Sequence, residues 1–145
     1  MAVLQAPALT VRDEHVWITA AGVFSLPLYR VVGVTASANA TFSSPPLTLP
    51  ALPLWANMAA GWHGAPPGDM PCDEACASYV AAELRDQATG DVVPGFEREK
   101  CLLMDIDGLR VPLLWQGVNT THMVGRRVIV RFYLRRASVF AIGAG

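Results

Sequence analysis

The sequence predicts an all-β fold: a two-sheet antiparallel β-sandwich of jelly-roll-like form. Twelve glycines and eleven prolines separate short runs that are rich in β-branched and aromatic residues. Several of these runs alternate between apolar and polar residues, and no helical stripe of useful length is present. The length of 145 residues suits one domain with one core. We therefore divide the chain into an N-terminal extended linker segment, residues 1–35, and a β-sandwich domain, residues 36–145.

The clearest predicted strand covers residues 127–142. Val128, Val130, Phe132 and Leu134 occupy every second position of its first half. Side chains alternate between the two faces of a strand, so this set should face the core. The strand should therefore be central to the sheet.

A second strand is predicted at residues 79–85, where Val80, Ala82 and Leu84 alternate in the same way. Residues 87–91 have the composition of a hairpin turn, and the breaker-rich residues 64–76 that of a surface loop. Further strands are expected at residues 15–19, 29–34, 40–43, 47–49, 52–58 and 109–115. Their spacing is typical of a sandwich.

Composition and charge exclude some classes of function. The formal net charge is −1, which disfavours a globally basic nucleic-acid binder. No apolar run approaches the roughly 18–20 residues that a membrane-spanning helix requires. Hydrophobic residues make up 52% of the chain and charged residues 16%, which is richer in apolar groups than an average soluble domain. Extra apolar surface is therefore expected to face a partner. The cellular compartment stays open.

Catalytic patterns are missing from the sequence. The chain has three histidines in unrelated segments, His15, His63 and His122. It contains no Gly-x-Ser-x-Gly elbow and no phosphate-binding glycine loop. Asp105 and Asp107 would share a face of an extended strand, but a turn beside Gly108 is the favoured interpretation. We therefore expect no enzymatic activity, no catalytic residue and no cofactor.

Three cysteines, Cys72, Cys76 and Cys101, leave one thiol unpaired in any disulfide arrangement. With His63 they could form a zinc site, but structural zinc sites usually show two close ligand pairs. A small disulfide loop or free thiols are favoured over a metal. A bridge from Cys76 could reach either Cys72 or Cys101, and spacing does not decide between them.

Two places are candidate ligand-binding sites. Arg131 and Arg135 share a strand face with Tyr133, and this face could hold an anionic sugar, a phosphate or an acidic protein patch. A solvated face paired with nearby acids is the simpler alternative. Trp62 and His63 flank the predicted loop, and tryptophan rings can stack on sugars. Core packing is the alternative explanation for most tryptophans of a small sandwich.

Five segments downstream of residue 41 resemble the C-terminal β-sandwich module of bacterial invertase-like glycoside hydrolase homologues. They are residues 42–49, 80–86, 93–97 with Cys101, 110–117 and 124–134, and the similarity spans roughly residues 31–142. Residues 14–19 and 28–32 resemble the last propeller strand and the link to such a module. The catalytic acids of those enzymes lie in a five-bladed propeller, so the resemblance implies no catalytic residue here.

The resemblance implies a non-catalytic accessory module that binds carbohydrate or packs against a partner domain. The alternative is a structural or interaction subunit of a larger assembly. In that case the apolar residues 16–34 and 47–62 would lie on a partner. The expected partner is a carbohydrate or an adjacent protein subunit, without a nucleic acid and without a membrane span.

Overall fold

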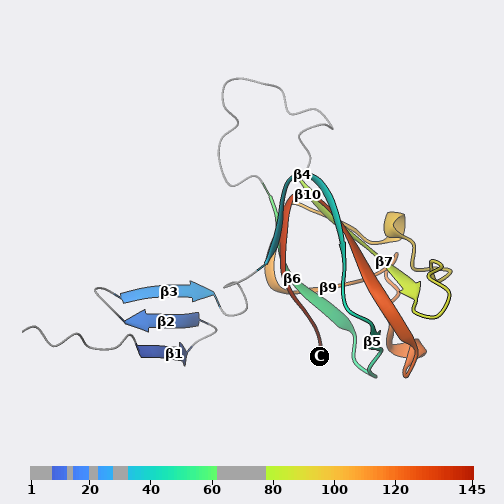
Figure 1. Cartoon of the computed structure of the whole chain (residues 1–145), viewed down its shortest axis with the longest axis horizontal. Helices are drawn as coiled ribbons and strands as arrows, with labels where there is room; N and C mark the ends of the chain where they lie inside the picture. Colours follow the sequence, from blue (N-terminus) through green and yellow to red (C-terminus); the bar gives the residue numbers. More distant parts are fainter. Residues whose placement is uncertain (1–7, 13–14, 20–22, 28–32, 62–77) are drawn as a thin grey trace, which may run out of the picture.

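The computed structural model describes residues 8–12, 15–19, 23–27, 33–61 and 78–145, and within them the all-β prediction is confirmed (Figure 1). The described helical turns are short 3₁₀ segments, η2 (Arg98–Lys100) and η3 (Thr121–Met123). The strands form two sheets, of three and seven strands. Across the described residues, we find no helix with the length and apolar character that a membrane span requires.

The small sheet is an antiparallel meander, drawn in blue in Figure 1. Its strands are β1 (Ala8–Arg12), β2 (His15–Thr19) and β3 (Val23–Pro27). β2 lies in the middle and pairs with both neighbours along its whole length. The strand predicted at residues 15–19 is therefore confirmed.

The large sheet is centred on one long strand, β10. Its members are β4 (Val34–Ser43), β5 (Leu47–Thr48), β6 (Leu54–Ala60), β7 (Tyr79–Asp86), β8 (Leu102–Met104), β9 (Ile106–Pro112) and β10 (Arg127–Ala144). The strands predicted at residues 79–85 and 127–142 are confirmed as β7 and β10. The strand predicted at residues 109–115 has different bounds, because β9 begins three residues earlier and ends at Pro112. Proline lacks the N–H that would continue a ladder.

β10 changes its neighbours halfway along its length. Its first half pairs with β7 on one edge and with β5 and β4 on the other. Beyond Arg135 the β7 edge is taken over by β6, which pairs with residues 138–144. A register shift marks this change, and Arg136 adopts a positive φ of 44° there. Such bulges bend a strand and increase its twist, so the sheet curls at this point.

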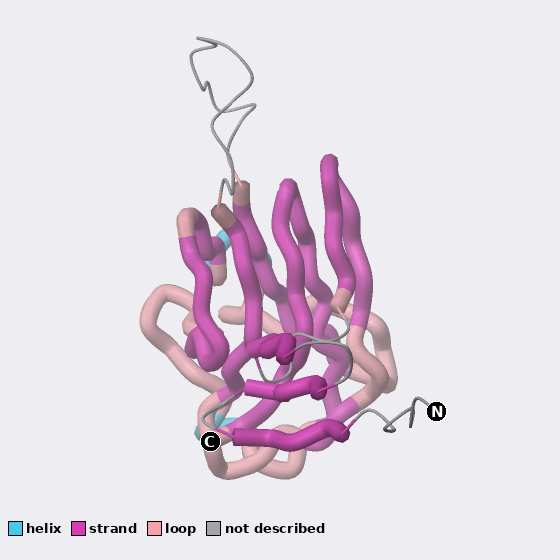
Figure 2. Tube along the Cα trace, turned by 90° about the vertical axis from the view of Figure 1, so that its left-hand side faces the viewer, coloured by secondary structure: helices cyan, strands magenta, loops and turns pink. Residues whose placement is uncertain are grey.

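The main body is therefore one curled sheet with the shape of a half-barrel, as Figure 2 shows. Two sheets packed face to face are not confirmed. The sequence signals of a sandwich and of a half-barrel are the same, because both contain short alternating strands joined by turns. In this chain the bend within β10 distinguishes the half-barrel from a sandwich.

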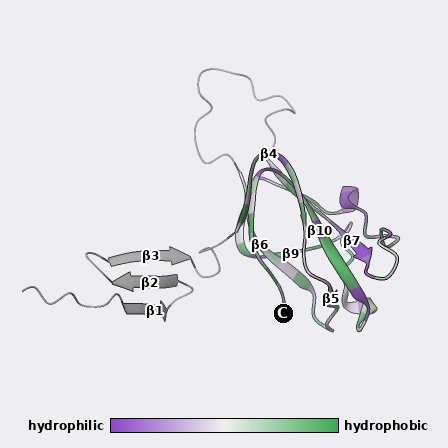
Figure 3. Ribbon diagram, in the orientation of Figure 1, coloured by the Kyte–Doolittle hydropathy of each residue, from purple (hydrophilic) through white to green (hydrophobic). Residues whose placement is uncertain are grey.

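The core lies on the concave face of this sheet. Val128, Val130, Phe132 and Leu134 are all 0–1% exposed, as their alternation predicted. On β7 the predicted core positions are equally buried, and Figure 3 shows apolar colouring along β10. Trp115, three residues after β9, belongs to the same buried cluster.

Candidate functional site

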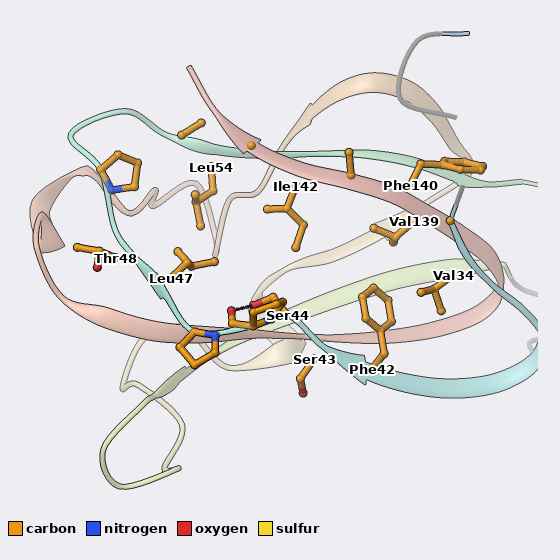
Figure 4. Close-up of a pocket in the computed structure, with 17 residues that line it drawn as sticks. Val34, Phe42, Ser43, Ser44, Leu47, Thr48, Leu54, Val139, Phe140 and Ile142 are labelled. Carbon is orange, nitrogen blue, oxygen red and sulfur yellow. Dashed lines mark hydrogen bonds between the residues drawn. The ribbon is translucent and has the colours of Figure 1, made fainter. Parts of the chain in front are cut away.

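An apolar groove opens on the concave face of the half-barrel, between β4–β5 and the second half of β10 (Figure 4). Its volume is about 850 Å³. The main apolar side chains of its walls are Val34, Phe42, Leu47, Leu54, Val139 and Ile142. None of the described lining residues carries a charge. The groove is therefore suited to apolar groups.

The bend in β10 creates this groove. β4 follows β10 only as far as the pair Val34–Val139, whereas β10 continues along β6 to Ala144. Strands β4 and β5 therefore diverge from the second half of β10. Phe42 pairs in register with the core residue Phe132, and their rings stack with centroids 5.1 Å apart. Within the described residues, the groove is thus a partly exposed continuation of the hydrophobic core.

Polar groups are few in the groove. Its side-chain hydroxyls belong to Ser43, Ser44 and Thr48. The Ser44 hydroxyl is already engaged, because it donates to the Pro45 carbonyl at 2.8 Å and accepts from the Val130 N–H at 3.0 Å. A polar ligand such as a sugar would find few partners here, and buried polar groups without partners are unfavourable.

The predicted residues Arg131, Tyr133 and Arg135 lie on the opposite, outer face of β10, beside β7. There Glu83 is only 4% exposed. Its Oε1 accepts hydrogen bonds from the Arg85 Nε at 2.6 Å and from the Tyr133 hydroxyl at 2.8 Å. The structure thus places Arg131 and Tyr133 next to a buried carboxylate that the sequence prediction had not included. The sequence did contain a signal for Glu83, because the alternation of residues in β7 predicts that this side chain faces outward.

Guanidinium groups lie over two aromatic rings of the outer face, those of Tyr133 and Trp55. The Cζ atoms of Arg98 and Arg131 lie 4.8 Å and 5.6 Å from the centre of the Tyr133 ring. On β6 the Trp55 ring lies against Gly143, and the Arg110 Cζ is 5.3 Å from its centre. Rings stacked with arginine are not free to stack on a sugar.

The remaining predicted site residues are distributed as follows. Trp62, His63, Cys72 and Cys76 lie outside the described residues. Cys101 is a buried free thiol, and burial raises its pKa to about 11. A thiol with so little thiolate at neutral pH is a poor nucleophile.

The expected turn beside Gly108 lies slightly earlier. Asp105 has a φ of 48° and joins β8 to β9, whereas Asp107 belongs to β9. In the part of the chain that the structure describes, no group of three or more His, Cys, Asp or Glu residues could hold a metal ion.

The corner at residues 93–97 contains a carboxylate with a perturbed pKa. Glu97 Oε1 accepts the Gly95 N–H at 3.0 Å, and Oε2 lies 2.9 Å from the Lys100 Nζ. The Gly95 hydrogen bond, followed by Lys100, lowers the pKa of Glu97 from 4.5 to about 2. The ionised form is therefore favoured in the folded state.

A lowered carboxyl pKa makes stability depend on pH. The contribution of Glu97 is complete above its unfolded pKa of 4.5 and is lost as the pH falls toward 2. We expect Glu97→Gln to lower the urea midpoint at about pH 6 and to match the wild type more closely at about pH 3. Urea unfolding at both pH values measures this. A difference that does not change with pH would contradict it.

Comparison with known proteins finds no match to this chain. No family model matches it, and neither the curated proteins nor the solved structures contain a significant match.

Proposed function

We propose that this chain is a non-catalytic accessory domain that packs against a neighbouring protein domain. The observation that carries the proposal is the uncharged groove of about 850 Å³, whose walls continue the hydrophobic core. Val34, on its wall, is 42% exposed. Fully burying a side chain of this size contributes about 1.5–3 kcal/mol, so covering the part of Val34 that is still exposed contributes about 1 kcal/mol. An apolar part of a neighbouring domain would therefore make a favourable contact here.

The small sheet supplies a second surface for the same neighbour. A sheet of three short strands needs a hydrophobic face, or packing against another element, to be stable on its own. In the described residues, the small sheet pairs with no strand of the large one. In its register β2 pairs with both neighbours along its whole length, and a covering partner domain would stabilise this sheet as well.

The resemblance to the C-terminal module of invertase-like homologues agrees with this proposal, because such a module stands beside a catalytic domain. We extend the resemblance to the fold and propose that the curled sheet corresponds to the two layers of a sandwich. One layer would consist of β8, β7 and the first half of β10, and the other of the second half of β10 with β6 and β9.

Carbohydrate binding is less favoured than packing against a neighbouring domain. The described groove offers few hydrogen-bonding groups, and arginines cover both Tyr133 and Trp55. The alternative of a subunit in a larger assembly uses the same groove. It differs in that the neighbour belongs to another polypeptide.

Mass measurements on the endogenous protein separate these possibilities. An accessory domain should be recovered in a longer polypeptide under denaturing conditions. A subunit should show a larger mass only under native conditions, and Val34→Glu in the groove should then release it. Thr41→Glu is the matched control, because Thr41 is also exposed on β4 but pairs with the outward Tyr133. Recovery as a free monomer would refute both versions.

A further inference from the structure

On the outer face of the sheet, the charge of Arg131 has no anionic partner among the described residues. Its direct neighbour across the ladder is Glu83. The Oε1 of Glu83 already accepts from Arg85 and Tyr133. Among the described residues Arg131 forms no ion pair, and its buried Nε has no hydrogen-bond partner. A buried donor without a partner is costly, and because Arg131 as a whole is only half-buried, an incoming carboxylate would meet the other N–H groups of its guanidinium.

A second guanidinium lies close by. Arg98 and Arg131 both approach the ring of Tyr133, at 4.8 Å and 5.6 Å from its centre. Arg98 is paired with Glu99 at 2.7 Å, but both side chains are more than half exposed. Such a surface ion pair contributes little. An incoming carboxylate could therefore displace Glu99 and bind between the two arginines.

Exposed apolar side chains lie beside this charged group. Leu102 and Met104 on β8 are 52% and 48% exposed. The register places Leu102 in one row with Ala81 and Tyr133. With strands about 4.8 Å apart, Leu102 lies about 10 Å from Tyr133 along that row. Arginine and tyrosine next to apolar residues are typical of protein interfaces.

We propose that this outer surface binds an acidic protein segment, with a carboxylate on Arg131 and Arg98 and an adjacent apolar side chain on Leu102 and Met104. Guanidinium groups recognise planar carboxylates by paired hydrogen bonds. A sugar acid is the weaker candidate, because the Tyr133 ring is already covered by arginine. The surface is separate from the groove, so it does not depend on the proposed packing there.

NMR titration of the whole chain with acetyl-Leu-Asp-Leu-amide tests the proposal, at constant ionic strength. The Arg131 Nε–Hε signal should shift with saturable binding. The matched Leu-Asn-Leu peptide should bind about tenfold more weakly or worse, because it lacks the charge. Arg131→Gln should cause a similar loss, whereas Glu99→Gln should strengthen binding by freeing Arg98. Arg127→Gln, at an exposed arginine of the same strand, should change little.

Three results would overturn the proposal. They are equal binding of the Asp and Asn peptides, binding that survives Arg131→Gln, and an equal shift with sodium chloride alone. Saturable binding of glucuronate without binding of the peptide would also overturn it, in favour of a sugar acid. If Arg131→Gln fails to fold, the Glu99→Gln variant still tests the proposal, because it should bind the Asp peptide more strongly than the wild type does.

Discussion

Replacing Trp115 with alanine should lower the free energy of unfolding by about 3–5 kcal/mol, the range for deleting a large buried aromatic side chain. Trp115 is 1% exposed. Its Nε1 donates to the Ala82 carbonyl at 2.8 Å, and its ring centre lies 5.0 Å from that of Phe96. It therefore joins the segment after β9 to β7 and to the corner at residues 93–97. The substitution would leave both a cavity and an unpaired carbonyl.

Urea unfolding of three variants separates these contributions. Trp115→Phe keeps an aromatic ring but loses the hydrogen bond, so it should cost less than Trp115→Ala. Leu114→Ala is the neighbouring control, because Leu114 is 37% exposed. It should change stability by about 1 kcal/mol or less. Equal losses at positions 114 and 115 would show that Trp115 does not close the core.

Replacing Phe132 with alanine should have a similar effect, about 3–5 kcal/mol. Phe132 is completely buried in the middle of β10, where it pairs with Ala82 on one side and Phe42 on the other. Its partner Phe42 lines the groove and is only partly buried. Phe42→Ala should therefore cost about 1–2 kcal/mol, since less surface is lost from the core.

The difference between the stability losses of Phe42→Ala and Phe132→Ala also tests whether the groove is open in solution. If the isolated domain keeps its groove open, Phe42 stays partly hydrated and the two losses differ. Equal losses, measured by urea unfolding, would mean that Phe42 is as buried as Phe132. The groove would then be closed in solution, contrary to the structure.

Much of the large sheet could be predicted from local patterns. The alternation of Val128, Val130, Phe132 and Leu134 correctly identified the face of β10 that enters the core. Period-two patterning reports which face is buried, and it does so without knowledge of the neighbours. The same argument held for β7.

The shape of the sheet could not be predicted in this way. The bend at Arg136 depends on a positive φ and on the exchange of β7 for β6, and neither leaves a local signature. A bulge also changes which alternate residues face inward. For that reason the inward position of Val139 does not follow from the pattern of the first half, whereas a second register shift after Val139 brings Ile142 back into phase.

The groove was partly foreseen. Residues 47–62 were expected to face a partner because they are apolar, and Leu47 and Leu54 do line the groove. Its other wall, from Val139 to Ala144, was missed. That wall is apolar for the same reason as any core strand. The separation of β4 from β10 leaves the part of this wall beyond Val139 partly exposed.

The central claim is that a neighbouring protein domain covers the groove, and photo-crosslinking in the source cells tests it directly. A benzophenone amino acid would replace Thr48, which is exposed at the groove, or Thr41, which is exposed on the outer face. The account predicts that position 48 crosslinks to a single apolar protein segment, whereas position 41 does not. Equal products at both positions, no product at position 48, or a product with a small molecule alone would contradict it.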